Sequence, residues 1–80
     1  MKIAEFVDIV DSGLEPEMQY KGKTYWAAYN GYNTPEKAFY EAYSDNIITF
    51  LKAEEILDKE YNGFKIRDMI ESLGEDDIDY

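Results

Sequence analysis

The aromatic side chains of this chain are concentrated in its middle. Nine of the thirteen lie between residues 20 and 50, where acidic and basic residues nearly balance. The two ends are acidic: residues 1–19 carry five acids and one Lys, and residues 53–80 carry ten acids and three bases. Because aromatic and β-branched residues favour strands, the distribution predicts a central sheet between acidic, helical ends.

The chain has 80 residues and contains neither Cys nor His. We therefore expect one small domain over residues 1–74 and an acidic, flexible tail over residues 75–80. Disulfides, thiolate chemistry and imidazole catalysis are excluded. The glycines are isolated, so no phosphate-binding loop exists, and the serines have no base to activate them. We expect a protein that is not an enzyme and has no cofactor and no metal site.

The first half of the chain predicts a helix followed by a hairpin. Residues 2–11 repeat apolar side chains with helical spacing, and Gly13 suits the end of such a helix. Residues 17–20 and 23–30 read as two strands around a turn at Gly22.

Residues 34–50 allow two interpretations. Thr34 followed by Pro35 is typical of a helix start, which would give a helix through Tyr43. The aromatic and β-branched residues favour instead two strands, about 37–43 and 47–50. We adopt the strands.

The C-terminal third has helical periodicity. Ala53, Ile56, Leu57 and Tyr61 share one face of a helix over about 52–60. A second helix over about 65–73 follows, after a break at Asn62-Gly63. The predicted fold class is therefore α+β: an N-terminal helix, a short antiparallel meander of four strands and two C-terminal helices.

The net charge of −10 disfavours nucleic acid and anionic membranes as direct partners. It is complementary to a basic protein, although it also serves solubility. The N-terminus lacks the cleavage site of a signal peptide and no apolar run has transmembrane length, so we expect a cytoplasmic protein.

The acidic surface, the many tyrosines and the absence of Cys and His resemble the small acidic proteins of bacteriophages and mobile elements, which include anti-CRISPR and anti-restriction inhibitors. The stretch NGFKIRDMIESL is similar to the ending of many small phage proteins. The resemblance implies an inhibitor in the cytoplasm of a host cell, and it assigns no residue a role.

The favoured function is a nucleic-acid mimic that blocks the basic nucleic-acid-binding site of a defence or DNA-processing protein. Two alternatives are an acidic adaptor or regulator that binds through a Tyr-rich sheet surface, and an accessory subunit whose acidity serves only solubility. A homodimer through the sheet is a further possibility. The predicted partner-binding residues are the acids of the helices and tail and three tyrosines of the sheet: Asp8, Asp11, Glu54, Glu55, Asp58, Glu75, Asp76, Asp77, Asp79, Tyr25, Tyr29 and Tyr40.

Overall fold

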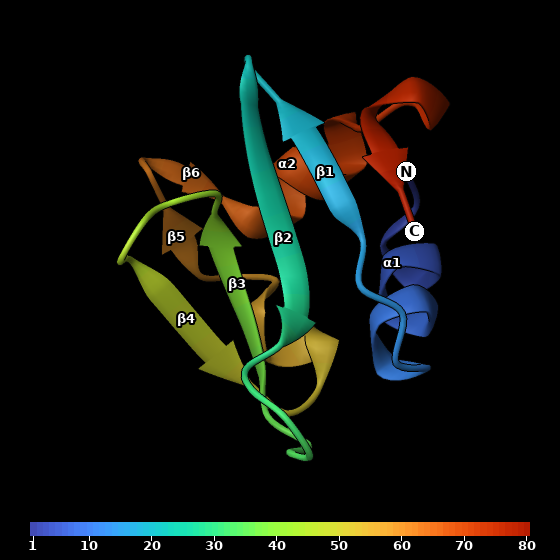
Figure 1. The fold of residues 1–80 in the computed structure, drawn as a ribbon. Helices are drawn as coiled ribbons and strands as arrows, with labels where there is room; N and C mark the ends of the chain where they lie inside the picture. The colour runs from blue at the N-terminus through green and yellow to red at the C-terminus, as the bar shows by residue number, and fades with distance from the viewer.

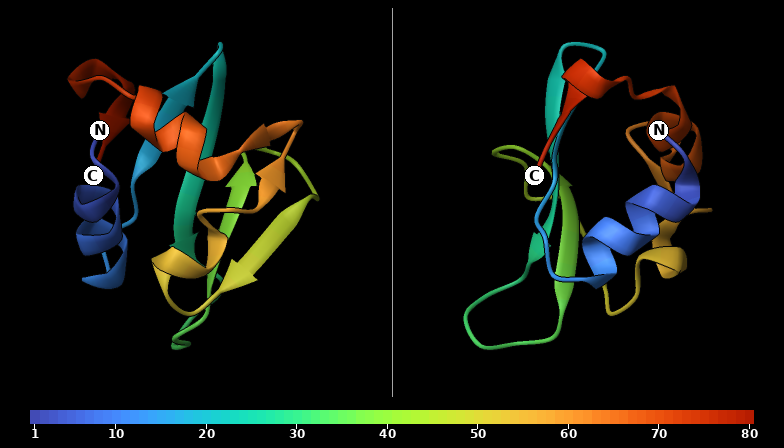
Figure 2. Two further views of the ribbon diagram at one scale, coloured as in Figure 1. Left: turned by 180° about the vertical axis from the view of Figure 1, so that it is seen from behind. Right: turned by 90° about the vertical axis from the view of Figure 1, so that its right-hand side faces the viewer.

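The computed structural model describes all 80 residues and shows an α+β fold built on one five-stranded antiparallel sheet. The strand order is β4-β3-β2-β1-β7, and all helices lie on one side of this sheet (Figures 1 and 2). The strands are β1 (Glu17–Tyr20), β2 (Lys23–Tyr29), β3 (Lys37–Glu41), β4 (Ile47–Phe50) and β7 (Ile78–Asp79).

Two α-helices cover the inner face of the sheet. Helix α1 (Ile3–Asp11) confirms the predicted N-terminal helix and buries Phe6, Ile9 and Val10. Helix α2 (Ile66–Ser72) buries Ile66, Met69 and Ile70 in the same way. All of these side chains except Ile9 meet the inward residues of the strands in a single core. No helix has the length and apolar composition needed to cross a membrane.

The sequence prediction of the sheet is confirmed for its antiparallel centre. Strands β1 and β2 join through Lys21 and Gly22, whose φ angles are both positive, as the tightest hairpin turns require. In the ambiguous region, residues 37–41 form strand β3, because Phe39 faces the core while Tyr40 faces away from it.

The predicted helix over 52–60 is wrong. Only a single 3₁₀ turn, η1 (Ala53–Ile56), forms there, and the chain continues into β5 (Glu60–Tyr61) and β6 (Phe64–Lys65). Asn62 and Gly63 both have positive φ and close this two-stranded hairpin. The Asn-Gly pair is thus a hairpin turn and not a helix break. The C-terminal third therefore has one α-helix where the sequence predicted two.

The predicted four-stranded meander also lacks a strand. Residues 75–77 form the 3₁₀ turn η2 (Glu75–Asp77), and β7 then pairs with β1 through Met18 with Ile78 and Glu17 with Asp79. Ile78 packs against the core, which gives this short segment an apolar reason to join the sheet. The segment that the sequence assigned to a flexible tail is thus an edge of the sheet in the structure.

Candidate functional site

The outer face of the sheet is not covered by any helix (Figure 2). Side chains alternate along each strand, and the inward set, which includes Met18, Tyr25 and Phe39, belongs to the core. Among the outward side chains, one from each of the five strands lies in a continuous row across the sheet, because these residues are paired directly with one another. In order from one edge to the other, this outer row is Asp79, Glu17, Trp26, Tyr40 and Ile47.

The outer row is apolar over β2, β3 and β4. Trp26 and Tyr40 are half-buried, and Ile47 is 47% exposed. Beside them Ala28 faces Ala38 across the strands, and both are buried although they lie on the outer side. The outer side of the sheet therefore combines small, buried side chains with the larger and partly exposed side chains of the outer row.

Two loops stand at the ends of this face. The β2–β3 connection (residues 30–36) and the β3–β4 turn (residues 42–46) both bend away from the helices, toward the outer side (Figure 2, right). Each presents a fully exposed tyrosine, Tyr32 in the first and Tyr43 in the second. Tyr43 has a φ of 68°, a left-handed conformation that costs energy for a bulky side chain.

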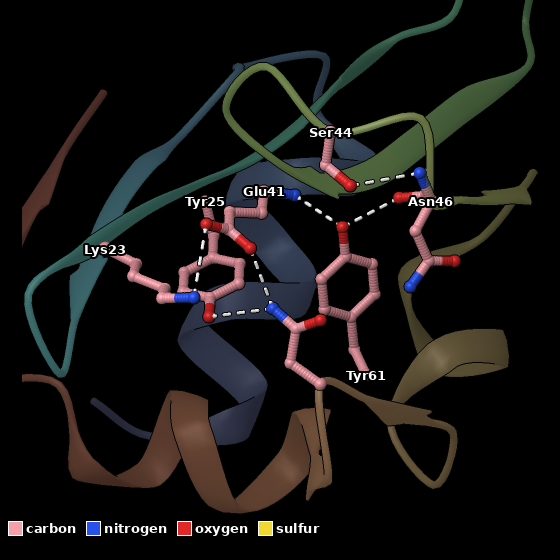
Figure 3. Close-up of polar contacts among 7 residues, drawn as sticks. Lys23, Tyr25, Glu41, Ser44, Asn46 and Tyr61 are labelled. Atoms are coloured by element: carbon pink, nitrogen blue, oxygen red, sulfur yellow. Dashed lines mark hydrogen bonds and ion pairs between the residues drawn. The ribbon is translucent and has the colours of Figure 1, made fainter.

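A polar network fixes the β3–β4 turn (Figure 3). The buried Tyr61 hydroxyl accepts a hydrogen bond from the Glu41 amide at 2.8 Å and donates one to the Asn46 carbonyl at 2.7 Å. The Asn46 amide donates to the Ser44 hydroxyl at 3.0 Å. Both ends of the turn are therefore tied to one ring, and this holds Tyr43 in its strained, exposed position.

The network extends to the Glu41 carboxylate. It accepts a hydrogen bond from the Asn62 amide at 2.8 Å and pairs with Lys23 at 3.6 Å. Asn62 also donates to the Tyr25 hydroxyl at 3.3 Å. These contacts connect strand β2, the β3–β4 turn and the β5–β6 hairpin (Figure 3).

At the β1–β7 edge the outer row ends in two acidic residues. Glu17 lies directly opposite Asp79, an arrangement of like charges that disfavours strand pairing. A shallow hollow beside this pair is also lined by Asp76 and Asp77. Of these acids, Asp77 has a structural role, since its carboxylate accepts a hydrogen bond from the Gly74 amide at 2.8 Å. No group of three or more acids is arranged to hold a metal ion.

The other predicted acids lie on the helical side, and three of them have structural partners. Asp11 accepts a hydrogen bond from the Ala53 amide at 2.9 Å, which joins α1 to η1. Glu55 caps its own turn by accepting from the Leu51 and Lys52 amides.

Asp58 is the third acid of the helical side with a partner. Its carboxylate pairs with Arg67 at 3.1 Å. The hydrogen bond from Arg67 and its positive charge lower the pKa of the Asp58 carboxyl below its ordinary value of 3.8. The pair is exposed to solvent, so we assign it a small effect on stability. The predicted acids whose carboxylates make no hydrogen bond or ion pair are Asp8, Glu54, Glu75, Asp76 and Asp79.

The three predicted tyrosines occupy different environments. Tyr25 is 2% exposed and belongs to the core, so it does not contribute to the outer face. Tyr29 is partly exposed on the inner side, where its ring lies 5.0 Å from the Lys37 ammonium. Only Tyr40 lies in the outer row. The predicted site omitted Trp26 and Tyr43, although the alternation of β2 already placed Trp26 opposite to Tyr25.

No protein-family model matches the chain, and comparisons with curated proteins and with solved structures found no match.

Proposed function

We propose that this chain is a non-catalytic binding protein that docks a basic surface of a partner protein against the outer face of its sheet. The observation that carries the proposal is the outer row, in which Trp26, Tyr40 and Ile47 lie uncovered beside the acidic pair Glu17 and Asp79.

The apolar part of the row has the properties of a binding hot spot. Aromatic side chains bring a large contact area and lose few rotamers on binding, and hot spots are enriched in Trp and Tyr. Tyr32 and Tyr43 add two fully exposed rings at the ends of the same face. A partner that covers this face would bury four aromatic side chains at once.

The acidic part of the row determines the charge of the partner surface that can bind. Glu17 and Asp79 lie within the same cross-strand row as Trp26, so a docked surface with Lys or Arg opposite this edge is favoured. The net charge of −10 also raises the rate at which a basic protein meets this one, and this effect falls with added salt.

The test is affinity capture from a bacterial lysate with matched variants. Trp26→Ala and Tyr40→Ala remove outer-face rings, whereas Tyr80→Ala removes an exposed ring that follows β7 and lies outside the outer row. We expect a specifically retained basic protein to be lost with the first two variants and kept with Tyr80→Ala. Equal retention by all three would refute the proposal.

A second candidate function is mimicry of nucleic acid, by which the chain would block the basic site of a defence or DNA-processing protein. It is favoured by the contact between Asp11 and Ala53, which brings the unpaired acids Asp8 and Glu54 onto neighbouring elements. Helix α1 and turn η1, which carry these two acids, lie on the helical side of the sheet, away from the outer face (Figure 2).

A competition assay with labelled nucleic acid separates the two functions. Under mimicry the captured partner releases its nucleic acid when this protein is added, and the double variant Asp8→Lys with Glu54→Lys abolishes the release. The double variant Asp68→Lys with Glu71→Lys changes the net charge equally on helix α2 and is the control. Simultaneous, independent binding of the protein and the nucleic acid would exclude mimicry.

A further inference from the structure

The two edges of the sheet are protected unequally. An edge strand exposes unpaired backbone groups, and proteins usually shield it with charge or keep it short. Strand β7 has two residues and carries Asp79. Strand β4 at the opposite edge has the sequence Ile-Ile-Thr-Phe, with no charged residue and no proline.

The backbone groups that β4 leaves unpaired follow from the pairing of β3. The Ala42 amide donates to the Thr24 carbonyl, and the Asn30 amide donates to the Glu36 carbonyl. The backbone N–H and C=O groups of the even-numbered residues of β3 therefore point toward β2. The backbone groups of its odd-numbered residues point toward β4, where Lys37 pairs with Phe50 and Phe39 pairs with Ile48. The N–H and C=O groups of Ile47 and Thr49 consequently point away from the sheet, and they take part in none of the turn, loop or side-chain hydrogen bonds.

This unpaired stretch has a defined end. The next outward residue is Leu51, whose amide donates to Glu55 at 3.2 Å and whose carbonyl faces the Lys37 ammonium at 3.5 Å. On the other side the strand begins at Ile47, directly after the β3–β4 turn. An incoming strand thus finds two residues, Ile47 and Thr49, each with a donor and an acceptor available.

We infer that a second copy of the chain pairs antiparallel with the β4 edge. Ile47 lies opposite Thr49 of the second copy and Thr49 lies opposite its Ile47, around a two-fold axis that passes between the two Ile48 residues. Each of the two pairs exchanges both N–H···O bonds, which gives four backbone hydrogen bonds. A register centred on Thr49 would place Ile47 opposite Leu51, whose amide is already occupied.

The charges favour a second copy over a strand of the basic partner. Residues 20–52 carry four lysines and three acids, so this is the part of the chain where two copies repel each other least. A basic strand would find no acid between Ile47 and Leu51. Pairing also continues the outer row, because Ile47 then lies beside Thr49 of the second copy, on the same face as Tyr40.

The inferred register predicts one unfavourable contact. Asp45 lies opposite Leu51 of the second copy, whose amide holds the Glu55 carboxylate, so two acids approach each other at each end. Added salt screens such a contact. Self-association through β4 should therefore strengthen with salt, whereas binding of a basic partner should weaken. The two proposals stand on different surfaces and fail independently.

The experiment combines sedimentation with amide exchange of the intact protein. At millimolar concentration and high salt we expect a species of twice the 9.4 kDa chain mass. The Ile47 and Thr49 amides should become protected only in that species, while those of Ile48 and Phe50 are protected at every concentration. Asp45→Asn should strengthen association. Thr49→Pro should abolish it, because this proline removes an outward N–H and no bond to β3.

Several results would overturn the inference. One is a monomer under all conditions, and another is a dimer in which the Ile47 and Thr49 amides exchange as in the monomer. A third is protection of these two amides only after a different protein is added, which would assign the edge to that protein. Because the exchange pattern is measured on the unmodified chain, the result does not depend on whether Thr49→Pro folds.

Discussion

The Tyr61 hydroxyl offers the sharpest test of how the β3–β4 turn is held. Tyr61→Phe keeps the buried ring and removes one oxygen, which bonds the Glu41 amide at 2.8 Å and the Asn46 carbonyl at 2.7 Å. Nothing else in the chain is positioned to replace it, since neither backbone group has a second partner outside the sheet.

The size of the effect follows from the two groups that lose their partner. One fully buried, unsatisfied backbone donor or acceptor costs about 1–3 kcal/mol. Both groups here are only partly buried, so water offsets part of each loss, and we expect Tyr61→Phe to destabilise the fold by about 1–3 kcal/mol in total. For a domain of this size the midpoint of thermal unfolding then falls by about 4–8 °C for each kcal/mol. Chemical denaturation monitored by circular dichroism measures the change in the free energy of unfolding.

Tyr25→Phe is the matched control. Tyr25 is equally buried, but its hydroxyl accepts one long hydrogen bond of 3.3 Å from Asn62, which keeps its shorter bond to Glu41. We expect this variant to cost less than about 1 kcal/mol. If Tyr61→Phe proves no more costly than Tyr25→Phe, the turn is not held by this ring and the argument is wrong.

Further predictions concern the outer face and the charges. Trp26→Ala should cost clearly less than the about 3–5 kcal/mol of a core aromatic, and the emission spectrum of Trp26 in the wild type should be that of a partly hydrated indole. Tyr43→Asn should raise the unfolding midpoint, because asparagine tolerates the left-handed conformation that costs other residues about 1–2 kcal/mol, while it weakens partner binding. Asp58→Asn should lower stability near neutral pH. The folded-state pKa of Asp58 is depressed by Arg67, so its contribution is present above the ordinary value of 3.8 and disappears as the pH falls through the lower folded value; denaturation curves of wild type and variant should converge in acid. The unfolding midpoint of the wild type should rise from low salt to about 0.15 M, as screening relieves the net charge of −10.

The sequence predicted the elements in which local pattern and burial agree. In α2 the apolar residues that recur at helical spacing are buried, and in α1 Phe6 and Val10 are buried as that spacing predicts. In β2 the large side chains alternate between faces, and the sequence placed Trp26 opposite to Tyr25 and Tyr29. It did not reveal which face the helices cover, since both carry large rings.

The hairpin in the C-terminal third escaped prediction because its inward residues fit two structures. Ala53, Ile56, Leu57 and Tyr61 are all buried, as a helix would require. A 3₁₀ turn followed by a strand buries the same four side chains. The deciding interactions are distant in sequence: Asp11 fixes the start of η1, and the hydroxyl of Tyr61 reaches β3 and its turn. Such tertiary contacts leave no periodic signal in the sequence.

Three features of the structure oppose common folding rules. Tyr43 holds a left-handed backbone with its ring in solvent, Glu17 faces Asp79 across two strands, and β4 leaves an uncharged edge unpaired. Each is locally costly, and local costs of this kind concentrate at functional sites. The first two lie on or beside the outer face, whereas the β4 edge is the surface that we assign to a second copy. Helices α1 and α2, by contrast, bury their apolar faces without such conflicts. The costs at Tyr43 and at the Glu17–Asp79 pair therefore point to the same face as the uncovered aromatics do, and this agreement is the strongest reason to expect the partner there.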